Sequence, residues 1–115
     1  MALRQDISLD LQETWIINIA CTDDQGAPLD LTNGDVRFRM DDGGVAVFDL
    51  NTSTGVVITN PSGGLASVTI TPAAQIAIPI AVDQYQYEFQ AVLANGVVSD
   101  QVYGALNVTP SLFAV

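Results

Sequence analysis

The chain has 115 residues, which suits one domain and is long enough to bury a core without disulfides or metal. Its 13 acidic residues against three arginines give a net charge of −10, so nucleic acids and anionic membranes are excluded as favourable partners. There is no histidine and no lysine, which removes the usual general base, zinc sites built from Cys and His, and lysine-based phosphate loops. We therefore predict no catalytic residue, no metal or cofactor site and no enzymatic activity.

The first half of the chain predicts strands separated by turns rich in Asp, Asn and Gly. Apolar and polar residues alternate from Ile7 to Leu11 and from Val36 to Met40, as on half-buried strands. Trp15 to Cys21 begins with apolar residues on both faces, which predicts a central strand of a sheet. Val45 to Leu50 is expected to form a further strand.

In the second half, short strands are expected at Val56–Ile58 and Ala66–Ile70. Thr71 and Pro72 suit a helix N-cap and first position, so one helical turn is predicted over about residues 72–77. Such a turn often links the two sheets of a sandwich.

The strongest strand signal runs from Gln84 to Leu93, with aromatic residues on one face and Gln and Glu on the other. Asn95-Gly96 then predicts a hairpin with a type I′ turn. Two strands are expected after it, at Val97–Tyr103 and Ala105–Val108.

Roughly seven or eight short strands with at most one helical turn predict an all-β fold, an antiparallel β-sandwich, with a small barrel as the alternative. We expect one domain over residues 1–115, with short flexible arms at 1–5 and 110–115. The chain opens without the apolar region of a signal peptide and carries no good transmembrane segment, which predicts synthesis in the cytoplasm without export.

Three groups of residues have two interpretations each. Asp23/Asp24 and Asp41/Asp42 are ordinary turn residues or, alternatively, ligands for Ca²⁺. Tyr85, Tyr87 and Phe89 share one strand face, which indicates core, with an aromatic platform for sugar as the alternative. Cys21 lies in an apolar run and is expected to be a buried, inert thiol.

The most unusual feature is the absence of charge from Leu50 to Val82. Exposed strands normally carry charged residues that block edge-to-edge pairing, and interface cores are depleted of charge. We therefore favour a surface covered by a partner, with a solvated face rich in Thr and Ser as the alternative. Because ten of the acids lie within residues 1–50, we expect one acidic solvated side and one neutral side.

The order of these segments resembles a known group of proteins. The most distinctive part of the resemblance is the turn at Asp23 to Thr32, Asp-Asp-Gln-Gly-Ala-Pro-Leu-Asp-Leu-Thr. The other segments that resemble this group are Gly-Asp-Val-Arg-Phe-Arg-Met, Leu-Asn-Thr-Ser-Thr-Gly-Val-Val-Ile-Thr, Gly-Gly-Leu-Ala-Ser-Val-Thr-Ile-Thr-Pro-Ala and Tyr-Gln-Tyr-Glu-Phe-Gln-Ala. Over residues 12–110 the chain resembles small immunoglobulin-like virion proteins of tailed bacteriophages and is similar to the N-terminal domain of baseplate upper proteins.

The resemblance implies an immunoglobulin-like fold and a non-enzymatic structural role in a phage virion, in the tail or baseplate or as capsid decoration. Its expected partners are other virion proteins (capsid, tail or baseplate subunits), bound in multiple copies or as a homo-oligomer through β-edges and the uncharged surface. The alternative is a carbohydrate- or cell-surface-binding sandwich, an adhesion module that uses the aromatic strand.

Overall fold

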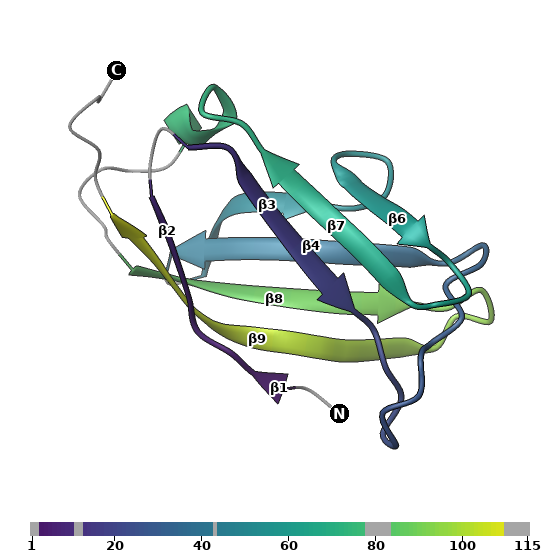
Figure 1. Ribbon diagram of the computed structural model, residues 1–115. Helices are drawn as coiled ribbons and strands as arrows, with labels where there is room; N and C mark the ends of the chain where they lie inside the picture. Colours follow the sequence, from purple (N-terminus) through teal and green to yellow (C-terminus); the bar gives the residue numbers. More distant parts are fainter. Residues whose placement is uncertain (1–2, 11–12, 43, 78–83, 110–115) are drawn as a thin grey trace.

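The computed structural model describes residues 3–10, 13–42, 44–77 and 84–109. They form two sheets that pack face to face (Figure 1). The six-stranded sheet contains β1 (Leu3–Arg4), β2 (Ile7–Asp10), β4 (Asp35–Asp42), β5 (Val45–Leu50), β8 (Gln84–Val92) and β9 (Val98–Thr109). The three-stranded sheet contains β3 (Trp15–Ala20), β6 (Val56–Asn60) and β7 (Leu65–Ile70).

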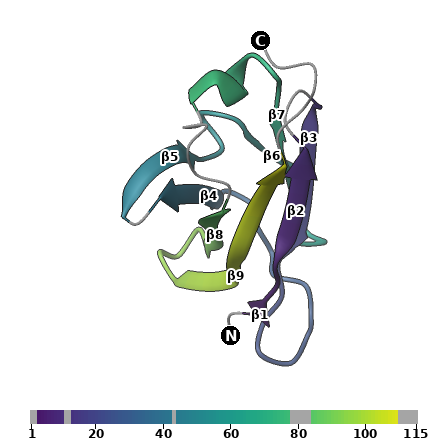
Figure 2. The same ribbon diagram turned by 90° about the vertical axis from the view of Figure 1, so that its left-hand side faces the viewer.

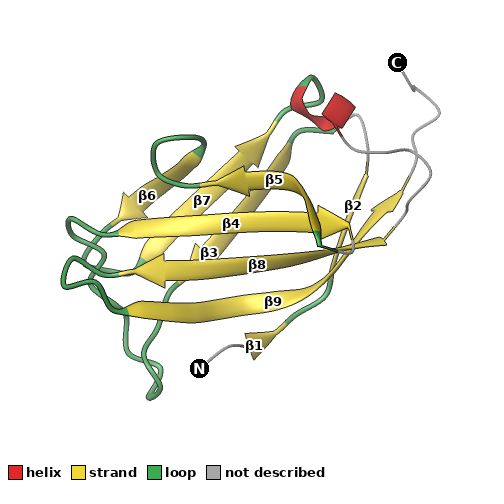
Figure 3. Cartoon of the chain, turned by 180° about the vertical axis from the view of Figure 1, so that it is seen from behind, coloured by secondary structure: helices red, strands yellow, loops and turns green. Residues whose placement is uncertain are grey.

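The strand order is that of an immunoglobulin-like sandwich. The six-stranded sheet runs β1-β9-β8-β4-β5, with β2 also paired to β9, and the smaller sheet runs β3-β7-β6 (Figure 3). Thus β3, β7 and β6 occupy the places of strands B, E and D, while β4, β8 and β9 occupy those of C, F and G. The predicted all-β sandwich is confirmed, although β1 and β2 pair with β9 in parallel and every other strand pair is antiparallel.

The core lies between the sheets because inward residues alternate with outward ones along the strands. On β8 the buried residues are Tyr85, Tyr87, Phe89 and Ala91, as predicted. Phe38 of β4 packs against Phe89 with ring centroids 4.9 Å apart, a favourable aromatic distance. Trp15 is 2% exposed, and its indole Nε1 donates to the Asp10 carbonyl at 2.8 Å, which ties β3 to the end of β2.

The expectation that β3 is a central strand is wrong. Within the part of the chain that the structure describes, β3 pairs only with β7 and forms one edge of the three-stranded sheet. Apolar residues on both faces suggested a strand buried on both sides, but the outward residue Ile16 is 63% exposed. Its hydrophobic character therefore belongs to the surface of the molecule.

The β8–β9 hairpin also differs from expectation. Gly96 has φ 89°, whereas Asn95 does not have the positive φ that a type I′ turn requires. The Gly96 amide donates to the Leu93 carbonyl and the Leu93 amide to the Val97 carbonyl, both at 2.8 Å, which makes a three-residue loop. After it, β9 is one continuous strand rather than two, and the register shift opposite Phe89/Gln90 accommodates an extra residue.

The single helical turn is a 3-10 helix, Ala74–Ala77, at the passage from the smaller sheet to the larger one. The Thr71 hydroxyl accepts the Ala74 amide at 3.3 Å, so Thr71 caps the turn as predicted. The buried Gln75 side chain donates to the Glu13 carbonyl at 2.6 Å and holds the turn against the start of β3.

Part of the arm expected at residues 1–5 pairs with the sheet. Leu3 and Arg4 form β1 and pair with Val102 and Tyr103 of β9, and the Gln5 amide donates to the Tyr103 carbonyl at 2.8 Å. β1 lies outside the strand expected at Ile7 to Leu11, and the described residues hold nine strands in all. Residues 1–2 and the arm expected at 110–115 lie outside the described residues.

Candidate functional site: the uncharged face of the three-stranded sheet

Among the described residues, one face of a sheet carries no charged side chain. It is the outer face of the three-stranded sheet, here called the neutral face, and consists of Ile16, Asn18, Ala20, Val57, Leu65, Ser67 and Thr69. Figure 1 looks onto this sheet, and Figure 2 shows it edge-on, opposite β4, β5 and β8. The described part of the charge-free stretch therefore lies partly on the surface, as predicted, while its alternate strand residues, such as Val68, are buried in the core.

The neutral face is continuous because the strand register brings its side chains into rows. Ile16 lies opposite Thr69, and Ala20 lies opposite Leu65. Ser67 is flanked by Asn18 on β3 and Val57 on β6, which makes a row across all three strands. The large apolar side chains stand at the margins: Ile16 is 63% exposed, Val57 59% and Leu65 41%.

The two sheets differ in how their edges are protected. The edges of the six-stranded sheet carry charges, Asp49 on β5 and Arg4 and Asp10 on β1 and β2, which discourage pairing with another strand. The edges of the three-stranded sheet, β3 and β6, carry none. A register shift between Ile58 and Asn60 disturbs the β6 edge, whereas β3 pairs with β7 in uninterrupted register. β3 is therefore the least protected edge.

The other half of the charge prediction agrees with the structure, with arginines interspersed among the acids. The outer face of the six-stranded sheet carries three arginines and six acids: Arg4, Arg37, Arg39, Asp10, Asp35, Asp41, Asp49, Glu88 and Asp100. Among the described residues, further negative charge lies in the loops, notably the segment that joins β3 to β4. Acidic residues in turns are spread around the molecule because the turns themselves are spread.

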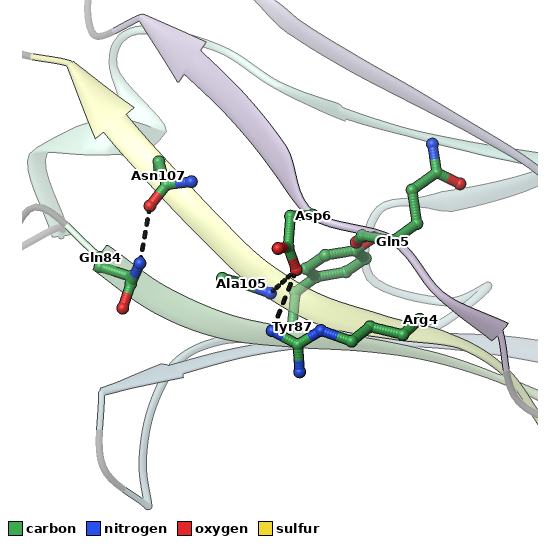
Figure 4. A network of polar contacts seen from close by, with 7 residues as sticks. All are labelled: Arg4, Gln5, Asp6, Gln84, Tyr87, Ala105 and Asn107. Atoms are coloured by element: carbon green, nitrogen blue, oxygen red, sulfur yellow. Dashed lines mark hydrogen bonds and ion pairs between the residues drawn. The ribbon is translucent and has the colours of Figure 1, made fainter.

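The aromatic residues of β8 do not form a sugar platform. Tyr85 is 2% exposed, Tyr87 4% and Phe89 1%, so all three belong to the core. The Tyr87 hydroxyl reaches the edge of the core and donates to the Gln5 carbonyl (Figure 4). Burial, and secondarily the charge of Asp6, raises the pKa of Tyr87. The tyrosine thus fastens the N-terminal segment.

The opposite face of β8 lines a groove that sequence reasoning missed. The groove has a volume of about 480 Å³ and is lined mainly by Arg4, Arg39, Asp41, Gln84, Gln86, Glu88, Tyr103, Gly104 and Ala105. The Arg39 Nε lies 3.6 Å from Asp41 Oδ2. Burial, then a hydrogen bond with Asp100 and repulsion from Asp100 and Asp41, raises the pKa of Glu88. The alternating Gln and Glu residues of β8 indicated a polar strand face. The sequence did not show that β4 and β9 would pair with β8 and complete the groove.

The distinctive loop at Asp23 to Thr32 is held by its own side chains. Asp23 Oδ1 accepts the amides of Gln25 at 2.9 Å and Ala27 at 3.0 Å, as turn aspartates commonly do. Hydrogen bonds from the Thr32 hydroxyl and amide lower the pKa of Asp30. Leu31 is buried in the core. These positions of the loop have structural roles.

The two aspartate pairs do not assemble a metal site in the described part of the chain, which holds no group of three Cys, Asp or Glu side chains placed to bind an ion. Asp41 and Asp42 are neighbours on β4, and Asp41 is paired with Arg39. Cys21 is fully buried, as predicted, and burial raises the pKa of its thiol to about 11.

Among the residues that the structure describes, no helix is long and apolar enough to cross a membrane.

No protein family model and no curated protein matches the chain. Among solved structures, the chain is similar to extracellular domains 3–5 of Drosophila OTK, with 20% identity, a TM-score of 0.36, and coverage of 97% of this chain and 34% of that chain. The chain thus spans about a third of that structure, and the assignment of the immunoglobulin-like sandwich rests on the strand order described above.

Proposed function

We propose that the chain is a non-enzymatic structural protein of a phage virion, located in the tail or baseplate or on the capsid as decoration. It binds neighbouring virion subunits through the neutral face and the adjoining strand edges. The observation that carries this proposal is the neutral face itself: a chain with a net charge of −10 places no charge on one whole side of a sheet. The phage assignment rests on the sequence resemblance centred on Asp23 to Thr32.

The composition of the neutral face fits a contact surface. Central parts of interfaces are depleted of charged residues because buried charges must be desolvated. Ile16, Val57 and Leu65 supply apolar area around a centre of Asn18 and Ser67, whose side chains can form hydrogen bonds with a partner. Within the described residues, the outer edge of β3 is paired with no other strand, so a strand of the partner can add to it.

The size of the neutral face indicates assembly by repeated weak contacts. Complete burial of an aliphatic side chain contributes about 1.5–3 kcal/mol, so burying the exposed parts of Ile16, Val57 and Leu65 contributes roughly 3 kcal/mol in total. Association of two free proteins costs at least about 4 kcal/mol in lost freedom of motion. The face alone therefore does not hold a stable dimer, whereas many copies in a symmetric particle hold each other together.

Two exposed valines provide a matched experiment. Val57 on the neutral face is 59% exposed, and Val98 on β9 of the other sheet is 54% exposed. Phage particles should be assembled with each Val→Asp variant, purified on a density gradient, and analysed by quantitative mass spectrometry. We expect Val57→Asp to lower incorporation at least about tenfold, because a charge is buried without a partner, and Val98→Asp to leave it unchanged. Absence of the wild-type chain from particles, or equal incorporation of both variants, would refute the proposal.

A further inference from the structure

The groove on the six-stranded sheet has the form of a small-molecule site. Two neighbouring rows of side chains build it: Arg39, Glu88 and Tyr103 lie side by side across β4, β8 and β9, and Asp41, Gln86 and Ala105 form the next row. Small residues at Gly104 and Ala105 leave room between the larger side chains. Its volume of about 480 Å³ lies within the usual range of ligand pockets.

The charges of the groove do not favour an anionic ligand. Both arginines are already paired with acids: Arg4 lies 3.2 Å from Asp6, and Arg39 lies 3.6 Å from Asp41 and 3.8 Å from Asp49. The whole chain, at −10, repels polyanions at longer range. An anionic ligand therefore gains no electrostatic advantage in the groove.

The hydrogen-bonding groups favour a ligand with many hydroxyls. The Gln86 side chain offers a donor and an acceptor, and Gln84 offers its amide oxygen, since its Nε2 donates to Asn107 Oδ1 at 2.9 Å. Within the described part of the chain, Asp41 Oδ1 is fully buried, whereas Oδ2 lies 3.6 Å from Arg39 Nε on a side chain that is 20% exposed. Asp41 Oδ2 can accept a hydrogen bond from a ligand hydroxyl.

The groove also has an aromatic wall. Tyr103 is 41% exposed, unlike the buried tyrosines of β8, and lies beside Glu88 on the neighbouring strand. The Arg4 guanidinium lies over the tyrosine ring, 6.0 Å from its centre. An exposed ring beside paired polar groups is able to pack against the apolar face of a sugar ring.

We propose that this groove binds a neutral oligosaccharide. The ligand packs against Tyr103 and donates a hydroxyl hydrogen bond to Asp41. The site uses the face of β8 opposite to the buried aromatic residues, and it lies on the other sheet from the neutral face. It is therefore independent of the proposed role in assembly.

The proposal is tested with the purified full chain on an array that contains neutral and acidic glycans, followed by NMR titration with the best neutral oligosaccharide. We expect neutral glycans to bind and to shift the amide signals of Arg39, Gln86 and Ala105. Asp41→Asn and Tyr103→Ala should each weaken binding about tenfold or more, because each removes one contact with the sugar. Asp30→Asn, the same chemical change in a distant loop, should have no effect.

Binding of acidic glycans only, absence of any neutral glycan ligand, or shifts confined to residues outside the groove would overturn the proposal. The shift map of the wild-type chain decides the question even if a groove variant does not fold. Val57→Asp should leave glycan binding intact. Loss of assembly in that variant is therefore distinguishable from loss of sugar binding.

Discussion

Gly104 allows the N-terminal segment to lie against β9, and we predict that Gly104→Ala detaches it. A Cβ atom at this position would lie 2.3 Å from the Gln5 carbonyl oxygen and 2.9 Å from Asp6 Oδ1. The first contact is with backbone, so the segment at Gln5 and Asp6 must move away. Three hydrogen bonds hold it. The Gln5 amide donates to the Tyr103 carbonyl at 2.8 Å. The Ala105 amide donates to Asp6 Oδ1 at 2.9 Å, and the Tyr87 hydroxyl donates to the Gln5 carbonyl; Figure 4 draws these residues.

Each such bond contributes about 1 kcal/mol net, so losing all three should lower the free energy of unfolding by about 3 kcal/mol. This is a large part of the roughly 5–15 kcal/mol of a typical domain, but the variant should still fold. Urea unfolding followed by Trp15 fluorescence measures the change, and hydrogen exchange should show faster exchange of the Gln5 and Ala105 amides.

Gly63→Ala is the matched control, because its Cβ would meet the end of the Asn60 side chain and no backbone atom. Moving that side chain costs the exposed hydrogen bond from the Gly63 amide to Asn60 Oδ1, so we expect a loss of at most about 1 kcal/mol. A Gly104→Ala variant as stable as wild type, or one destabilised with unchanged protection of the Ala105 amide, would refute the reasoning.

Three further predictions concern single groups. The folded state raises the pKa of Glu88 above its ordinary 4.5, so the folding stability that the protonated carboxyl contributes is lost as pH rises through the raised pKa. Glu88→Gln should remove this loss. We expect a smaller drop in unfolding free energy between pH 4.5 and pH 7 in the variant than in the wild type. The same loss in both proteins would contradict the assignment. Cys21, with its pKa near 11 and no exposure, should not react with a thiol reagent until the protein unfolds; rapid reaction of the native protein would show that the site opens. Gly96→Ala should cost about 1 kcal/mol in thermal or urea unfolding because Gly96 has φ 89°, and a neutral result would contradict the three-residue loop.

Local pattern was sufficient to predict most strands and their inward faces. The alternation along β8 identified Tyr85, Tyr87 and Phe89 as a single face, and their burial agrees with the core interpretation. The pairing partners of a strand are not local, which is why β3 was misplaced at the centre of a sheet. The hydrophobic pattern of the sequence is the same whether the Ile16 side chain is exposed or buried.

The candidate sites were predictable to different degrees. The neutral face could be anticipated, because the absence of charge from Leu50 to Val82 is a property of the sequence itself. The contribution of β3 to that face could not, since it depends on the pairing of Ile16 with Thr69. The groove needs the order β4-β8-β9 to bring Asp41 and Tyr103 to either side of β8. Asp41 therefore carried only the interpretation of a turn residue or Ca²⁺ ligand.

The central claim is that the neutral face is covered in an assembled particle. Hydroxyl-radical footprinting, read by mass spectrometry, should compare the free chain with the chain in purified phage particles. We predict that Ile16, Val57 and Leu65 are labelled in the free chain, as their exposure requires, and are strongly protected in particles, while Val98 is labelled equally in both. Equal labelling of Ile16, Val57 and Leu65 in the two states would contradict the account.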